Sequence, residues 1–142
     1  TLDGGRFVNA NLSKATLVGA SLKGANFQGA NLGSVKAQNA NFSGANFQSS
    51  QMKESAMQGA DISNANLSTS DLSGANLQGA DLSNSNLQGA QLQNANLAGA
   101  DLSSAKVSGA TFDNTTMPDG SMCSGAACAS KLSNVGAITP TL

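Results

Sequence analysis

The chain has 142 residues, a length typical of one domain, and 39% of them are hydrophobic. It contains no Trp, Tyr or His, only 11% of its residues are charged, and its formal net charge is −1. These numbers exclude a globular core filled with large side chains, and we expect no direct nucleic-acid binding. No run of about 18 apolar residues is present, so no membrane span is expected. No basic segment followed by an apolar one opens the chain, and because it begins with Thr1 we expect a processed or trimmed product.

A five-residue repeat runs from Leu2 to Met122 without an insertion. Its 25 central positions hold 13 Leu, all five Phe, all four Met, and Ile62, Val107 and Ala37. The residue two places before the centre is Ala in 16 of 24 units and Ser in four more. The residue directly before the centre is Asn or Asp in 13 of 24 units. Such strict placement argues against a flexible linker, although the chain is poor in charge and rich in Ser, Asn and Gly.

A period of five fits neither a helix nor a flat strand. On an α-helix each step of five turns the centre by about 140°, which distributes the apolar side chains around the whole cylinder. On a flat strand successive centres point to opposite faces. The small residue and the centre can both face one core only if the chain turns in every unit, and the Gly, Asn and Ser that follow the centre suit such turns. We therefore predict a narrow coil around an axis, with about four sides.

The units Ala25-Asn26-Phe27, Ala60-Asp61-Ile62 and Ala80-Asp81-Leu82 follow the pattern A-(D/N)-L-x-x. Through this pattern residues 1–122 resemble the pentapeptide-repeat family. The resemblance implies an all-β fold, a right-handed quadrilateral β-helix with four units per coil and hence about six coils. We assign residues 1–122 to the β-helix and residues 123–142 to a short C-terminal helical cap and a loose tail, in which Leu132 and Ile138 would cover the last coil.

Four units per coil place each residue directly above the one four units earlier, which predicts which side chains form vertical columns. One column then holds three aromatic rings followed by three aliphatic side chains. This predicted core stack consists of Phe7, Phe27, Phe47, Leu67, Leu87 and Val107. Aromatic rings pack well at the roughly 5 Å spacing between coils, which favours a vertical period of four units.

The same period places Asp61, Asp81 and Asp101 above one another on one outer face. Three interpretations are open: a solvated acidic stripe, a weak cation site, and a contact surface for a basic partner. Charge is also unevenly distributed along the chain. Residues 1–60 carry five Lys and Arg against two acidic residues, or +3, whereas residues 61–142 carry two Lys against six Asp, or −4.

Cys123 and Cys128 are the only cysteines, and both lie in the predicted cap. A zinc site is not expected, because two thiolates without a His cannot complete a tetrahedral shell. Two interpretations remain: a pair of reduced, small apolar residues, or a disulfide that fixes the short helix on the last coil and implies an oxidising compartment. Some cyanobacterial and chloroplast members of the resembled family are exported and close with such a helix. The resemblance therefore favours the thylakoid lumen or the periplasm, with the cytoplasm as the alternative.

The sequence contains no nucleophile elbow, phosphate-binding loop or zinc motif, and no His for proton transfer. We therefore expect no enzyme, no catalytic residue and no cofactor. The leading hypothesis is a non-enzymatic structural or protein-interaction solenoid with an unknown protein partner, able to self-associate through its uncapped N-terminal coil. The alternative, drawn from another branch of the family, is a DNA-mimicking binder of DNA gyrase of the quinolone-resistance type. The net charge of −1 fits that alternative poorly.

Overall fold

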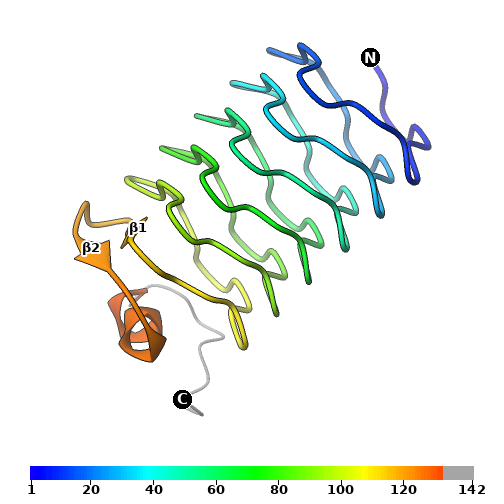
Figure 1. Cartoon of the computed structure of the whole chain (residues 1–142). Coiled ribbons are helices and arrows are strands. Elements are labelled where there is room, and N and C mark those ends of the chain that lie inside the picture. The colour runs from blue at the N-terminus through cyan, green and yellow to red at the C-terminus, as the bar shows by residue number, and fades with distance from the viewer. Residues whose placement is uncertain (133–142) are drawn as a thin grey trace.

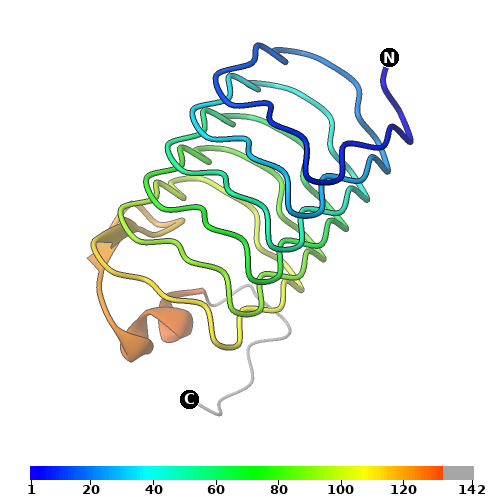
Figure 2. The ribbon, with the colours of Figure 1, turned by 45° about the vertical axis from the view of Figure 1, so that its right-hand side comes forward.

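The computed structural model describes residues 1–132, which form a tower of stacked coils (Figure 1). Residue 1 lies at one end of the tower and the helix of the C-terminal segment at the other. Figure 2 shows that successive coils repeat the same outline directly above one another. Parallel bridges join each residue before a centre to its equivalent four units later, along the whole ladder from Arg6 and Asn26 to Asn96 and Thr116. This confirms the predicted vertical period of four units.

Each unit of an inner coil is hydrogen-bonded through its backbone to the coils on both sides. In the unit centred on Leu32, the amide of Leu32 donates to the carbonyl of Gln51 in the next coil at 2.6 Å. The amide of Asn31 donates to the carbonyl of Ala10 in the preceding coil at 2.8 Å. The amide of Val35 donates to the carbonyl of Leu32 at 3.1 Å and closes a tight turn within the coil. The same three bonds recur along the ladder of coils. A narrow coil can therefore satisfy the hydrogen-bonding groups of its backbone without forming long strands.

The turn in each unit is made by the second residue after the centre. At every such position from Gly4 to Asn114 the backbone angle φ is positive, between 52° and 73°. A positive φ at the third position is the geometry of a type II turn, which favours Gly and tolerates Asn. The turn predicted from these residue types is thus confirmed. Its backbone conformation costs more free energy where Glu54 (φ 56°) or Thr69 (φ 55°) occupies the position than where Gly does.

The interior is filled by the central side chains and by the small residues two places before them. Every centre from Leu22 to Met117 is buried. The rings of Phe7, Phe27 and Phe47 stack with centroids 5.0 and 4.9 Å apart, as the four-unit period predicts. Phe42, on the adjacent side, meets the rings of Phe27 and Phe47 edge-on. Burial of each large side chain contributes roughly 1.5–3 kcal/mol, so this column is a main source of stability.

The regular coil ends in a short antiparallel hairpin. Strand β1 (Thr115–Thr116) pairs with strand β2 (Met122–Cys123), and the turn between them is closed by the amide of Met117, which donates to the carbonyl of Ser121 at 2.8 Å. The 3₁₀-helix η1 (Ala126–Lys131) follows. No helix within residues 1–132 is long and apolar enough to cross a membrane.

The hairpin changes the expected role of Met122. The repeat pattern places this residue at a central position, but its side chain is 55% exposed, so Met117 is the last buried centre of the repeat. The reason is that the chain reverses after Met117 and runs back along β1 instead of continuing around the coil. Leu132 is buried against the core as expected. Ile138 and the predicted loose tail lie outside the described residues.

Candidate functional site

The residue directly before each centre lines the outer sides of the tower. In the unit of Phe47, the Oδ1 atom of Asn46 accepts a hydrogen bond from the backbone amide of Gln48 at 3.0 Å. All 13 Asn and Asp residues at this place form the same bond to the amide two residues on. This pairing satisfies an amide that the coils leave free, and it explains why Asn and Asp are frequent here.

The predicted acidic stripe is present as a column. Asp61 bridges to Asp81, and Asp81 to Asp101, so the three residues follow one another on one side of the tower. Each carboxylate accepts a bond from the hydroxyl of the Ser two residues on, at 2.6 Å for Asp61 and Asp81 and 2.5 Å for Asp101. One oxygen of each carboxylate is therefore occupied by two local donors, the hydroxyl and the amide of that Ser.

These donors affect the acidity of the carboxyls. The hydroxyl and then the amide of Ser103 hold the pKa of Asp101 below its usual value. Partial burial raises the pKa of Asp71, but the donors of Ser73 and the nearby Lys53 ammonium outweigh it and leave this pKa lowered as well. Both carboxyls are thus stabilised as anions by neighbours within their own or the preceding coil.

The acidic column receives no support as a cation site. Within residues 1–132, no group of three or more His, Cys, Asp and Glu side chains is arranged to hold a metal ion. The Ser hydroxyls already occupy the inner carboxylate oxygens of Asp61, Asp81 and Asp101. The hydrogen bonds of these serines involve Oδ1 of each carboxylate, and the solvated stripe and the contact surface for a basic partner stay predictions.

An ion pair on the side of the tower opposite the acidic column was not predicted from the sequence. The Nζ atom of Lys53 lies 3.5 Å from Oδ2 of Asp71 in the next coil. Because the two residues are almost a full coil apart in the sequence, the pair can be recognised there only once the four-unit period is known. The exposed lysine side chain limits the contribution of this pair to stability.

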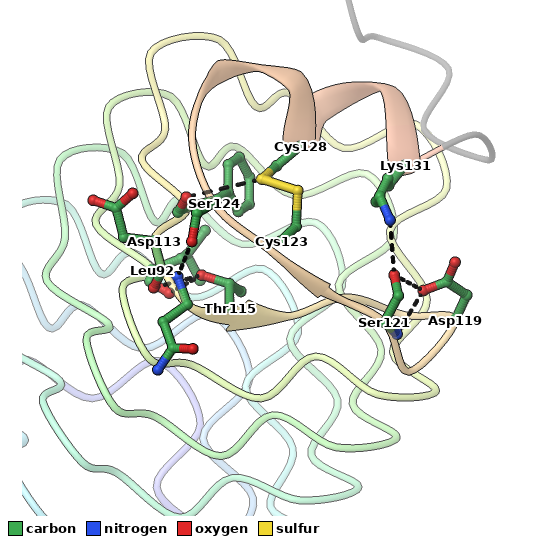
Figure 3. The surroundings of a disulfide bond; sticks show 11 residues. Leu92, Asp113, Thr115, Asp119, Ser121, Cys123, Ser124, Cys128 and Lys131 are labelled. Atoms are coloured by element: carbon green, nitrogen blue, oxygen red, sulfur yellow. Dashed lines mark hydrogen bonds between the residues drawn. A yellow bond between two sulfur atoms is a disulfide. The ribbon is translucent and has the colours of Figure 1, made fainter.

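The two cysteines form a disulfide between β2 and η1 (Figure 3). Their Cα atoms are 5.7 Å apart. The side chain of Cys128 is buried, whereas that of Cys123 is only half-buried. The Sγ atom of Cys128 lies 3.8 Å from the carbonyl oxygen of Phe112, the last regular aromatic centre of the tower.

The first coil of the tower is less well covered than the later ones. The side chain of Leu2 is 47% exposed, and the next three centres are only half-buried. Within the described residues, the backbone amides of Arg6, Asn11 and Thr16 donate no hydrogen bond, although their counterparts in later coils all donate to the coil before. This end therefore presents apolar side chains together with unpaired backbone groups.

Two family models match the chain. Residues 33–102 match the model described as pentapeptide repeat region, and residues 6–44 match the model described as pentapeptide repeats (8 copies). No curated protein sequence matches the chain. Together the two family matches extend from residue 6 to residue 102, across most of the ladder.

Several solved structures are similar to the chain. HetL, a pentapeptide repeat protein involved in heterocyst differentiation regulation from the cyanobacterium Nostoc sp. strain PCC 7120, is 33% identical over 84% of this chain and 62% of HetL, with a TM-score of 0.39. A trypsin-treated form of QnrB1, a plasmid-mediated fluoroquinolone resistance protein, is 22% identical over 82% of this chain and 71% of QnrB1, with a TM-score of 0.52. A pentapeptide repeat protein from the Arabidopsis thaliana thylakoid lumen is 28% identical over 75% of this chain and 67% of that protein, with a TM-score of 0.26.

The likeness to QnrB1 shows the fold alone, which is the β-helix that the ladder and the family matches also describe. The chain spans 62% of the length of HetL and 61% of a second form of QnrB1.

Proposed function

Because the chain belongs to the pentapeptide-repeat family, we propose that it is a non-enzymatic solenoid, a rigid rod of about six coils that serves as a structural or protein-interaction module. One observation carries this proposal. The apolar side chains fill the interior, and all 13 Asn and Asp residues before a centre are bonded to their own backbone. The side chains that remain free are mostly short polar groups held in straight columns on four outer sides, and specificity lies in those columns.

The test is to capture a protein partner from a chosen side of the rod. A photo-crosslinking amino acid is placed at one exposed position per side, in four separate variants: Lys23, Gln48, Lys53 and Gln78. The proposal expects one side to capture the same protein repeatedly from the cells that make this chain, while the other sides serve as matched controls. Equal labelling from all four sides, or none from any, would contradict an interaction module.

We also propose that the first coil binds a second copy of this chain. The half-exposed centres around Leu2 and the unpaired amides of Arg6, Asn11 and Thr16 support this contact, since a second coil edge would cover both. Sedimentation of the chain and of Leu12→Lys tests it. The parent chain should form dimers at micromolar concentration and the variant should remain monomeric, whereas a monomeric parent would refute the contact.

An exported location, the thylakoid lumen or the periplasm, forms part of the same proposal. It is supported by the disulfide of Cys123 and Cys128, because such bonds persist in oxidising compartments. Rapid alkylation of thiols in intact cells, followed by mass measurement, should find both cysteines unmodified. Two alkylated cysteines would place the chain in a reducing compartment.

Gyrase binding is the second candidate function, and the charge distribution disfavours it. Most acidic residues lie in residues 61–142, the half with a charge of −4, while residues 1–60 carry +3. A rod with one basic half does not resemble the uniform negative charge of DNA. Gyrase supercoiling measured with and without a fluoroquinolone should be unchanged by this chain, and inhibition or protection would favour this second function instead.

A further inference from the structure

The two ends of the tower differ in how well their last side chains are covered. In the first coil the side chain of Leu2 is 47% exposed, whereas the equivalent position in the last coil, Leu102, is 3% exposed. Val107 and Phe112, also central residues of the last coil, are 4% exposed each. Residues 124–132, which we call the covering segment, follow β2 beside the last coil (Figure 3). Its Cys128 and Leu132 belong to the same buried core as the coils.

The covering segment is joined to the tower by contacts of two kinds. Near its start, the amide of Gly125 donates a hydrogen bond to the carbonyl of Phe112 at 2.7 Å. The hydroxyl of Ser124 accepts a hydrogen bond from the amide of Asn114 at 2.7 Å. Farther along, the disulfide fixes η1 to β2, with five residue steps between Cys123 and Cys128. Lys131 adds an exposed bond from its Nζ atom to the hydroxyl of Ser121 at 3.2 Å.

The position of η1 beside the last coil depends on the Cys123–Cys128 disulfide, whereas a coil is held by backbone hydrogen bonds to its neighbours. Each unit of an inner coil donates backbone hydrogen bonds to both neighbouring coils, as shown for Leu32 and Asn31. The amide of Cys128 in η1 donates to the carbonyl of Gly125 in its own segment, at 3.2 Å. A short helix of this kind has little stability of its own, so its position depends on what links it to the tower.

We propose that the Cys123–Cys128 disulfide is a redox latch, and that a dithiol reductant opens it and uncovers the apolar end of the last coil. A thiolate of the reductant attacks the Sγ atom of the half-buried Cys123, the S–S bond breaks, and the Sγ atom of Cys128 leaves as a thiolate that takes up a proton. The second thiol of the reductant then attacks the mixed disulfide and releases Cys123 as a thiol. Two electrons pass to the protein, and the reductant becomes a disulfide.

Opening the latch converts a closed end into one that resembles the N-terminal end. The side chains of Val107 and Phe112 would then be exposed in the way those of Phe7 and Leu12 already are. Reduction would thereby give the rod a second exposed apolar end, which forms only when a dithiol is present. The latch is independent of the proposed interaction through the four sides, since it concerns the end of the tower. It shares the Cys123–Cys128 disulfide with the proposed exported location.

Amide hydrogen exchange, followed by NMR, tests the latch on the complete chain. In the oxidised protein the amides of Gly125 and Cys128 should be protected. Reduction with dithiothreitol, verified by a mass gain of about 2 Da, should speed their exchange by about 10- to 100-fold, the range expected when a six-residue loop loses its crosslink. The amides of Leu32 and Phe47 in the ladder should not change, and the fluorescence of an apolar dye should rise.

The double variant Cys123→Ser/Cys128→Ser is the matched control. Without reductant it should exchange at Gly125 like the reduced protein, and dithiothreitol should have no further effect on it. The latch is refuted if the fully reduced protein keeps the protection of Gly125 and Cys128 within twofold. It is equally refuted if the ladder amides accelerate together with them, because the disulfide would then stabilise the whole fold, or if millimolar dithiothreitol leaves the native disulfide intact.

Discussion

Ser50 and Ser70 occupy the same place in successive coils and are equally buried, but only the hydroxyl of Ser70 has a hydrogen-bond partner. The Oγ atom of Ser70 donates to the carbonyl of Leu67 at 2.7 Å. No partner is present for the Oγ atom of Ser50, nor for that of Ser55 on the next side of the same coil. A buried hydroxyl without a partner costs about 1–3 kcal/mol, so this coil carries an avoidable loss of stability.

The substitution Ser50→Ala should therefore stabilise the protein. Alanine is the usual residue at this place in the repeat, and it removes the unpaired hydroxyl. We expect the free energy of unfolding to rise by about 1 kcal/mol in urea titrations. The matched variant Ser70→Ala removes a formed bond and should lower the free energy of unfolding by about 0.5–1.5 kcal/mol. If both variants shift the free energy of unfolding in the same direction, the missing hydrogen bond of Ser50 does not lower stability as we expect.

Phe27 is the most connected ring of the core, with stacked neighbours at 5.0 and 4.9 Å and an edge-on neighbour at 5.9 Å. The substitution Phe27→Ala leaves a cavity between three rings and should cost about 3–5 kcal/mol of unfolding free energy. Phe27→Leu keeps an apolar side chain of the type found at most centres and loses mainly the ring contacts, about 0.5–1.5 kcal/mol each. Urea titration of both variants should give a clearly smaller loss for Leu. Equal losses would show that ring stacking, and not filled volume, dominates at this site.

Glu54 occupies the turn position with a positive φ of 56°. The substitution Glu54→Asn keeps a polar side chain but suits this backbone better, and should raise the free energy of unfolding by about 0.5–1 kcal/mol. Glu54→Gln is the control, because it removes the charge without relieving the backbone, and it should leave stability nearly unchanged. A gain from Gln as large as that from Asn would mean that charge, and not conformation, is responsible.

The Asp101 carboxyl offers a test by pH. Ser103 lowers the pKa of this carboxyl in the folded state, so its contribution to stability is present above the unfolded-state pKa of about 4 and is lost as the pH falls through the lower, folded-state value. Ser103→Ala should raise the pKa of Asp101 toward its usual value, measured from the carboxyl carbon shift in NMR titrations. Ser43→Ala, at the equivalent place in a distant coil of the same side, should leave that pKa unchanged. An unaltered pKa in Ser103→Ala would show that the hydroxyl does not affect the titration of Asp101.

The recurring unit predicted a narrow coil with about four sides, and the resemblance to the pentapeptide-repeat family implied the quadrilateral β-helix. The column of Phe7, Phe27 and Phe47 indicated the four-unit period, and the turn residues indicated where the chain bends. The hydrogen bond that the amide two residues on donates to the Oδ1 atom of the Asn or Asp before each centre was not predicted, because the repeat shows the residue preference but not the direction of the side chain.

Prediction was weakest where the repeat ends. Met122 keeps the phase of the repeat, yet the hairpin turns it outward, since a local turn can override a periodic pattern. The spacing of Cys123 and Cys128 was compatible with free thiols as well as with a disulfide, and only their placement on β2 and η1 distinguishes the two. The acidic column was predicted from the period, but its occupied carboxylate oxygens follow from side-chain directions that no period encodes.

The bridges between equivalent residues of successive coils also determine how such a chain can change its length. Removing residues 62–81 would join Asp61 to Leu82, and every column on every side would remain in order with one coil fewer. Removing a single unit would keep the repeat pattern but rotate all later columns by a quarter turn, so that aromatic rings, carboxylates and lysines would acquire new neighbours. Genes for this architecture can therefore lengthen or shorten the rod by whole coils without altering its surface pattern, whereas any shorter step rewrites the surface and leaves the core pattern intact.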